Sequence, residues 1–275
     1  MRIRAGWVWA AWVMSAIFVN GAASAAIIVA HDDASDPAYT AGGPYHLLNG
    51  GFGFGPWQTN GFPFGGNSNL HEIVATSTIN GPGGPDIDTA GVAWGNNADP
   101  TGNTFAARRS LLTDLQVGGT YAISYDGGDV DGQETIGWGL GGNAICQFYF
   151  NASVASGNYQ FYDTLSNTTI DTGILQTFGG LRLTLARDTA STYRFTAVRL
   201  SDSATFSVGP FNYDTSIITG IRAINVTNAD GGAGGGHQMF VNSIEATMVP
   251  EPVALSGYGA ALVTALSRRR PRRSY

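Results

Sequence analysis

The 275-residue chain contains no lysine, one cysteine and four histidines, and charged residues make up only 12% of it. Without lysine, neither a Walker phosphate loop nor a Ser-x-x-Lys nucleophile can be built, and no Gly-x-Ser-x-Gly elbow is present. The single cysteine, Cys146, excludes an intrachain disulfide, and its apolar context in residues 144–150 predicts a buried, inert thiol. The histidines are too scattered for a zinc site. The sequence therefore carries no enzyme signature.

The first 25 residues have the three parts of a secretory signal peptide. Arg2 and Arg4 form a positive start, residues 5–19 are apolar, and an A-x-A pattern ends at Ala25. We expect a helix over this segment and cleavage between Ala25 and Ala26. An uncleaved N-terminal anchor is the alternative.

The last 27 residues combine three features in a fixed order. A motif that is extended and hostile to helix comes first, because proline cannot continue a helix and biases the preceding residue toward extended structure; it consists of Val249, Pro250, Glu251 and Pro252. An uncharged apolar segment, residues 253–267, follows and predicts a short hydrophobic helix. A basic cluster that suits the cytoplasmic side of a membrane comes last; it consists of Arg268, Arg269, Arg270, Arg272 and Arg273.

This three-part tail, residues 249–275, resembles the PEP-CTERM sorting signal of exported bacterial proteins. The resemblance implies that an exosortase, a membrane enzyme of the cysteine-transpeptidase kind, recognises and removes the tail. It further implies a precursor tethered transiently to the inner membrane of a Gram-negative bacterium. The matured protein would then reach the outer surface or an extracellular matrix, in association with extracellular polysaccharide or biofilm.

The apolar segment of the tail leaves a second interpretation open. Fifteen helical residues span roughly 22 Å, which is shorter than the ~30 Å hydrocarbon core of a bilayer. Flanking arginines can snorkel and a bilayer can thin, so a short span is feasible. The alternative is a tail that only touches anionic lipid through its basic end.

Residues 26–248 are expected to form one domain, and they are numerous enough for a single large core. Seven arginines and nineteen carboxylates give this span a formal charge of −12. An acidic domain without a basic patch argues against nucleic acid or an anionic membrane as its partner.

The pattern within this domain predicts an all-β fold. No window shows a sustained apolar repeat of 3.6 residues, whereas Leu181, Leu183 and Leu185 alternate with other residues as in a half-buried strand. Short strand candidates separated by glycine, asparagine and aspartate favour a two-sheet β-sandwich of the jelly-roll type. A bulge is expected near Ala197. The expected strands are 26–30, 72–79, 91–94, 105–112, 121–125, 135–140, 144–150, 158–162, 181–187, 192–200, 206–208, 217–226 and 239–247.

Strands 121–125 and 135–140 flank an acidic glycine turn and are expected to form a hairpin. Its carboxylates make it a weak calcium candidate, since calcium takes about six to eight oxygen ligands; they are Asp126, Asp129, Asp131 and Glu134. The spacing fails the EF-hand pattern, and the alternative is a solvated turn, for which aspartate and glycine are the usual residues. No other cofactor is expected.

The same run weakly resembles the carboxylate-rich strand of some sandwich-fold glycosidases, in which two carboxylates flank the scissile bond. The leading glutamate of that pattern is absent here. A β-sandwich glycoside hydrolase or lyase acting through residues 126–134 is therefore kept as the alternative function.

Two further clusters have a chemical and a structural interpretation. Aromatic residues in and near a glycine-rich stretch suggest a sugar-stacking platform, with Trp57, Trp94 and Phe62 as the candidate glycan contacts. The alternative is that these rings seal one end of the core. His31, Asp32, Asp33 and Asp36 suggest a metal corner, and the alternative there is a polar turn.

The expected function is that of an exported, exosortase-sorted cell-surface or extracellular-matrix protein without catalytic activity. Glycan binding is the finer form of this hypothesis. The expected partners are the secretion machinery, an exosortase and extracellular polysaccharide.

Overall fold

The computed structural model of the chain describes residues 25–59, 70–80, 87–98, 104–127, 131–232 and 238–250. One compact unit spans Ala26–Val249. The predicted signal helix, the apolar tail segment and the terminal arginine cluster lie outside the described residues. Within the described part, no helix has the length and apolarity needed to cross a bilayer.

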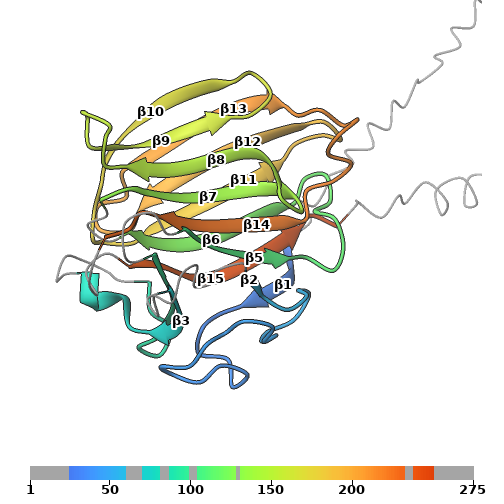
Figure 1. Cartoon of the computed structure of the whole chain (residues 1–275). Coiled ribbons are helices and arrows are strands. Elements are labelled where there is room, and N and C mark those ends of the chain that lie inside the picture. Colours follow the sequence, from blue (N-terminus) through green and yellow to red (C-terminus); the bar gives the residue numbers. More distant parts are fainter. Residues whose placement is uncertain are drawn as a thin grey trace, which may run out of the picture. The chain divides into compact units, whose positions relative to one another are not determined.

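The described part of the unit is built almost entirely from strands, which form two antiparallel sheets. This confirms the all-β, two-sheet sandwich. One short 3-10 helix, η1 (Ser77–Asn80), is the described exception. Figure 1 shows one sheet lying over the other, with β7, β8, β9 and β10 as a meander in the nearer layer.

The eight-stranded sheet has the order β13-β12-β11-β6-β15-β4-β3, with β1 also pairing with β15. Its strands are β1 (Ile27–Asp32), β3 (Leu70–Ala75), β4 (Ala93–Ala98), β6 (Thr120–Gly127), β11 (Leu181–Arg187), β12 (Thr192–Arg199), β13 (Thr205–Asn212) and β15 (Met239–Met248).

The seven-stranded sheet has the order β10-β9-β8-β7-β14-β5-β2. Its strands are β2 (Gln58–Thr59), β5 (Thr104–Ser110), β7 (Gln133–Leu140), β8 (Asn143–Asn151), β9 (Asn158–Asp163), β10 (Thr168–Leu175) and β14 (Ala223–Ala229).

The two ends of the compact unit lie side by side. Strand β1 pairs with β15 so that Ile27 stands opposite Met248. The chain therefore enters and leaves the domain at one place in the eight-stranded sheet.

The core lies between the sheets and is rich in aromatic rings. The predicted alternation in β11 is confirmed, because Leu181, Leu183 and Leu185 are all buried. The ring of Phe195 in β12 lies 5.4 Å from that of Trp138 in β7, centroid to centroid, so the two sheets are in direct contact through them. In strands such as β5 and β11, alternate residues fill the core and the others face outward.

The predicted hairpin around residues 126–134 is wrong. Strand β6 pairs with β11 and β15, whereas β7 pairs with β8 and β14, so the acidic turn crosses from one sheet to the other. Aspartate and glycine favour any tight change of direction, and this local signal does not distinguish a hairpin from a crossover.

Other boundaries also differ from the prediction. The expected strand 217–226 starts only at Ala223, because Ile217 and Ile218 donate their N–H groups to the Asp214 carbonyl in a turn. Strand β3 ends at Ala75, before η1. The irregularity in β12 lies between Tyr193 and Phe195 rather than near Ala197, and β10 was not predicted.

A fully buried ion pair ties the N-terminal region to the seven-stranded sheet. The Arg109 guanidinium on β5 donates to Asp32 Oδ2 at 2.5 Å, and both side chains are inaccessible to solvent. The guanidinium also donates to the carbonyls of Gly50 and Gly55. It lies 5.3 Å from the ring centroid of Phe54. One cation thus organises the glycine-rich segment that leads into β2.

Burial of this pair carries a desolvation cost, which is reflected in the raised pKa of Asp32. Burial raises the pKa of the Asp32 carboxyl to about 6, while the Arg109 charge and the Tyr39 hydroxyl act in the opposite direction. A buried ion pair adds little net stability compared with apolar packing, but it is expensive to break. Its role here is to position the segment around it.

Glycines allow this segment to pass close to β1. Gly51 and Gly53 have φ values of +62° and +79°. A Cβ on Gly51 would lie 2.0 Å from the His31 carbonyl oxygen, so no other residue fits there. The segment then continues into β2, where Gln58 pairs with Arg108.

We expect Asp32→Ala to lower the free energy of unfolding by about 3–5 kcal/mol, because the Arg109 guanidinium is left buried without a counter-charge. Urea denaturation followed by tryptophan fluorescence measures the change. Asp202→Ala, which removes the exposed partner of Arg199, is the matched control and should change stability little. Equal losses in the two variants would contradict the organising role of the buried pair.

Candidate functional site

A row of polar side chains crosses the outward face of the seven-stranded sheet. Register places Arg108 of β5 opposite both Gln58 of β2 and Asn225 of β14. Asn225 in turn stands opposite Gly137 of β7, and Gly137 opposite Gln147 of β8. We call Gln58, Arg108, Asn225, Gly137 and Gln147 the central row.

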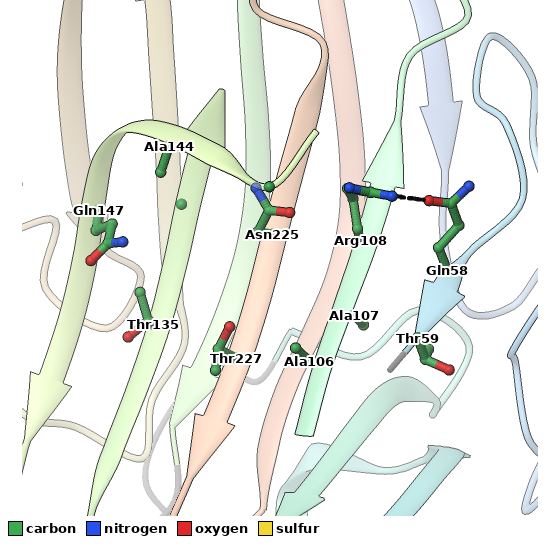
Figure 2. A pocket seen from close by; sticks show the side chains of 12 residues that line it. Gln58, Thr59, Ala106, Ala107, Arg108, Thr135, Ala144, Gln147, Asn225 and Thr227 are labelled. Carbon is green, nitrogen blue, oxygen red and sulfur yellow. Dashed lines mark hydrogen bonds between the residues drawn. The ribbon is translucent and has the colours of Figure 1, made fainter. Parts of the chain in front are cut away.

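The central row borders a pocket of about 390 Å³. Small residues lower the surface there: Gly137 has no side chain, and a Cβ built on it would lie 3.4 Å from that of Ala144. Figure 2 shows Asn225, Gln147, Arg108 and Gln58 on separate strands around this depression. The lining residues are Gln58, Thr59, Ala106, Ala107, Arg108, Thr135, Gly137, Gly142, Ala144, Gln147, Asn225 and Thr227.

The floor of the pocket holds an unsatisfied hydrogen-bond donor. The Asn225 Nδ2 atom is buried and has no hydrogen-bond partner among the described residues. A buried amide without a partner costs about 1–3 kcal/mol. Such a group in a pocket is suited to a ligand atom that accepts the hydrogen bond.

Arg108 forms one wall of the pocket, and Gln58 holds it there. The Arg108 Nε and Nη2 atoms both donate to Gln58 Oε1, the former at 3.1 Å. This fork fixes the guanidinium and leaves its Nη1 without an assigned partner in the described part of the chain. The pocket therefore has a positioned cationic donor at one side.

The composition of the pocket suits recognition by hydrogen bonds. Its lining has amide and hydroxyl groups and one guanidinium, and none of its lining residues is a carboxylate, a histidine or a cysteine. General acid–base catalysis needs a titratable group that can take and return a proton, and the pocket's lining provides none that titrates near neutral pH. The arrangement fits binding of an uncharged polar ligand.

The expected aromatic platform is not at the surface. Trp57 and Trp94 are both 0% exposed, and their ring centroids lie 5.0 Å apart in the core. Neither ring can stack on a glycan, so the prediction of glycan contacts at these two residues is wrong. The glycine-rich segment folds back over them, which local sequence does not reveal. Phe62, the third candidate contact, lies outside the described residues.

Two of the carboxylates of residues 126–134 are buried. Asp126 and Glu134 are each 1% exposed. Glu134 accepts a hydrogen bond from the Tyr125 hydroxyl, and burial together with the charges of both carboxylates raises the pKa of that hydroxyl. Asp131 is exposed, and Asp129 lies outside the described residues. The described part of the chain contains no group of three or more possible metal-binding side chains.

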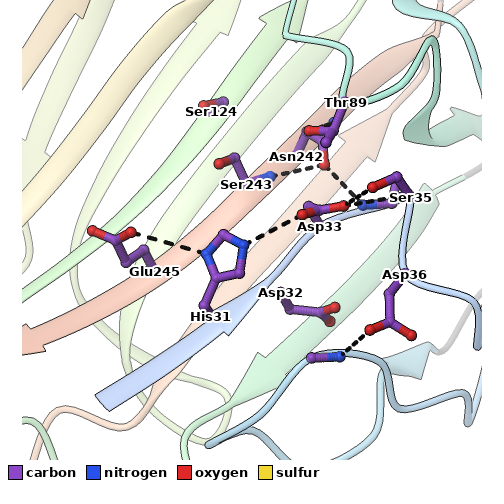
Figure 3. Close-up of polar contacts among 12 residues, drawn as sticks. His31, Asp32, Asp33, Ser35, Asp36, Thr89, Ser124, Asn242, Ser243 and Glu245 are labelled. Carbon is purple, nitrogen blue, oxygen red and sulfur yellow. Dashed lines mark hydrogen bonds and ion pairs between the residues drawn. The ribbon is translucent and has the colours of Figure 1, made fainter. Parts of the chain in front are cut away.

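The predicted corner at His31 is a set of local turn contacts. The His31 Nε2 atom lies 3.3 Å from Asp33 Oδ2, and its Nδ1 atom lies 3.9 Å from Glu245 Oε2. Dashed lines mark both contacts in Figure 3. The Asp32 side chain is buried. Asp36 accepts hydrogen bonds from the backbone of Ala38 and Gly51, which lower the pKa of its carboxyl. These groups support the fold of the turn, and they do not form a group of three or more side chains that could hold a metal ion.

The remaining predicted residues are placed as follows. Cys146 is a buried free thiol, as predicted, and burial raises its pKa. Ala25 and Ala26 precede β1, and Val249 and Pro250 follow β15. Glu251, Pro252 and the five terminal arginines lie outside the described residues.

The central row was missed in the sequence because it exists only across strands. Each residue of the central row stands at an outward position of its strand. A polar residue at such a position is common and does not by itself indicate a site. Register brings them together, and register depends on pairing between distant segments. The available signal was the recurrence of asparagine and glutamine, rather than charged residues, at these outward positions.

No protein-family model matches the chain, and no curated protein matches it either. Solved structures with a similar arrangement include a carbohydrate esterase from the Shiga toxin-encoding bacteriophage phi24B, with a TM-score of 0.46 and 13% identity over 82% of this chain and 99% of that one. The CBM2 module of the evolved Dit protein of Lactobacillus casei BL23 phage J-1 has a TM-score of 0.46 and 11% identity over 81% and 96%. Galectin LEC-6 of Caenorhabditis elegans has a TM-score of 0.34 and 13% identity over 49% and 86%. At these scores the function has to be argued from this chain's own residues.

We expect Glu134→Ala to destabilise the domain by about 1–3 kcal/mol, since the buried Tyr125 hydroxyl loses its acceptor. A ligand that binds the folded state raises the melting temperature. Because we expect no calcium to bind, millimolar calcium should leave the melting temperature of wild type and variant unchanged. Thermal melts in calcium and in chelator measure this, with Asp131→Ala as the exposed control. A calcium-induced rise in wild type that Glu134→Ala abolishes would restore the metal hypothesis.

Proposed function

We propose that this protein is an exported surface or matrix protein that binds a glycan on the outward face of its seven-stranded sheet and does not act on it chemically. The observation that carries the proposal is the unpartnered Asn225 donor at the floor of the pocket, within the central row. Among the buried side-chain atoms of the described residues that have no hydrogen-bond partner, Asn225 Nδ2 is the one whose residue lines this pocket.

Amide and hydroxyl side chains match the chemistry of sugars. Each sugar hydroxyl both donates and accepts, and asparagine and glutamine offer a donor and an acceptor on one rigid group. Asn225, Gln147 and Gln58 supply three such groups around one depression, and Thr135 and Thr227 add hydroxyls. Because strands hold these groups, their positions are set before a ligand binds.

The absence of carboxylate, histidine and cysteine side chains from the pocket's lining supports binding without catalysis. A glycoside hydrolase needs two carboxylates on either side of the scissile bond. Asp126 and Glu134, which the sequence suggested for that role, are each only 1% exposed, so neither is accessible to a glycan chain. Neither is among the residues that line the pocket.

Export and sorting are the second part of the proposal, and they are supported by the two terminal sequence patterns. The signal peptide ends at Ala25, and the Val249–Pro252 motif begins directly after β15. Since β1 and β15 pair, both processing points border the same place in the eight-stranded sheet. The pocket lies on the other sheet, where processing leaves it untouched.

We expect Asn225→Ala to weaken glycan retention by about fivefold, the equivalent of one hydrogen bond of about 1 kcal/mol. Affinity electrophoresis against a panel of bacterial and plant polysaccharides, scored with and without release of reducing sugar, measures retention and catalysis together. Thr227→Ala, in the pocket, should also weaken retention, whereas Thr196→Ala, an outward threonine of the other sheet, should not. Retention by no polysaccharide, or equal loss in the two threonine variants, would refute the site.

Intact-mass spectrometry of the mature protein from its native cell tests the sorting proposal. The expected mass lacks residues 1–25 and the segment that contains Arg268–Arg273. A form that keeps these arginines, and that is unaffected by loss of an exosortase, would exclude the sorting signal.

A further inference from the structure

A second pocket adjoins the first on the same face of the seven-stranded sheet. Its volume is about 400 Å³, and it shares Gly142, Ala144 and Gln147 with the first pocket. The side chain of Gln147 therefore stands at the junction of the two. The second pocket is lined by Gly142, Asn143, Ala144, Ile145, Gln147, Tyr162, Thr164, Leu165, Tyr213, Asp214, Ile217 and Ile218.

Hydrogen bonds hold in place the segments that line the second pocket. The turn after β9 is anchored where the Thr164 N–H donates to the Ile145 carbonyl at 3.0 Å. The facing loop is closed where the Ile218 N–H donates to the Asp214 carbonyl at 2.9 Å. The Tyr162 hydroxyl donates to Asn167 Oδ1 at 2.8 Å, which holds the tyrosine. The cavity is thus a built feature of the fold.

The lining of the second pocket is more apolar than that of the first. Ile217 and Leu165 are 61% and 53% exposed, and both line this cavity together with Tyr162. A sugar ring presents apolar C–H groups on its faces and hydroxyls at its rim. Aliphatic and aromatic side chains cover such faces, whereas amides serve the rim.

The charges along both pockets nearly cancel. Arg108 is the one charged residue that lines the first pocket, and Asp214 is the one that lines the second. Hydrogen bonds from Ser216 lower the pKa of the Asp214 carboxyl, so it is ionised at neutral pH. Because the domain as a whole carries −12, a polyanionic chain would meet overall repulsion without a compensating basic patch.

We infer that the two pockets are one groove for a linear, neutral polysaccharide chain, with its polar subsite at Asn225 and its apolar subsite at Ile217. The inference rests on the proposed glycan binding and adds the form and charge of the ligand. From Gln58 to Tyr162 the register crosses five strand intervals, roughly 24 Å at about 4.8 Å each. A chain of several sugar units is needed to span that distance.

Isothermal titration of the folded 26–249 unit with oligosaccharides of increasing length tests the inference, since this unit is compact by itself. The probes are β-1,4-linked gluco- and manno-oligosaccharides of two to six units, with mannuronate oligomers of the same lengths as the acidic series. We expect affinity for a neutral series to rise at least tenfold from dimer to hexamer. Ile217→Ser should remove most of this gain, while Ile79→Ser, which changes an exposed isoleucine in η1, should alter neither the gain nor the affinity for the dimer.

The possible results distinguish a groove for a neutral polysaccharide chain from glycan binding in general. Equal affinity for dimer and hexamer, tighter binding of the acidic series, or an Ile217→Ser variant that loses nothing would overturn the inference. Failure of every neutral series, while the polysaccharide panel still shows retention that depends on Asn225, would also overturn it and leave glycan binding intact. Failure in both experiments would remove the proposed function as well.

Discussion

The buried ion pair between Asp32 and Arg109 is the constraint on which the functional face depends. Arg109 points into the core from β5, and its neighbour Arg108 points outward into the pocket. The carbonyls that Arg109 binds belong to the segment that delivers Gln58 to β2. Gln58 then holds Arg108. The buried Arg109 therefore helps to position the outward Arg108, through the segment that leads to Gln58 and the pairing of β2 with β5.

The two ends of the compact unit and the pocket lie on different sheets. The eight-stranded sheet contains β1 and β15, and with them both ends of the compact unit. The seven-stranded sheet presents asparagine, glutamine and threonine outward, beside a guanidinium held in place. Aromatic rings in the shared core, such as those of Phe195 and Trp138, pack the two sheets against each other. Because both ends of the unit lie in the eight-stranded sheet, neither end borders the face on which we propose that the glycan binds.

Sequence predicted what is local and missed what depends on pairing. The alternation of Leu181, Leu183 and Leu185 gave the strand and its buried face, and the apolar context of Cys146 gave its burial. The turn near Asp126 looked like a hairpin because turn chemistry does not encode which sheet comes next. Trp57 was predicted as a glycan contact although it is buried. Its burial depends on how the glycine-rich segment folds, and the local sequence does not show this. Asn225 and Gln147 were not predicted as ligand contacts, since their proximity arises from register across distant strands.

The central claim is that ligand binds the outward face of the seven-stranded sheet. Nuclear magnetic resonance of the isotopically labelled 26–249 unit, titrated with the glycan it retains, tests this most directly, because side-chain amides report their own contacts. The account predicts the largest shifts at the side-chain amides of Asn225 and Gln147, with backbone shifts along β5, β14, β7 and β8. Shifts confined to the eight-stranded sheet, or around the buried Asp126 and Glu134, would contradict it.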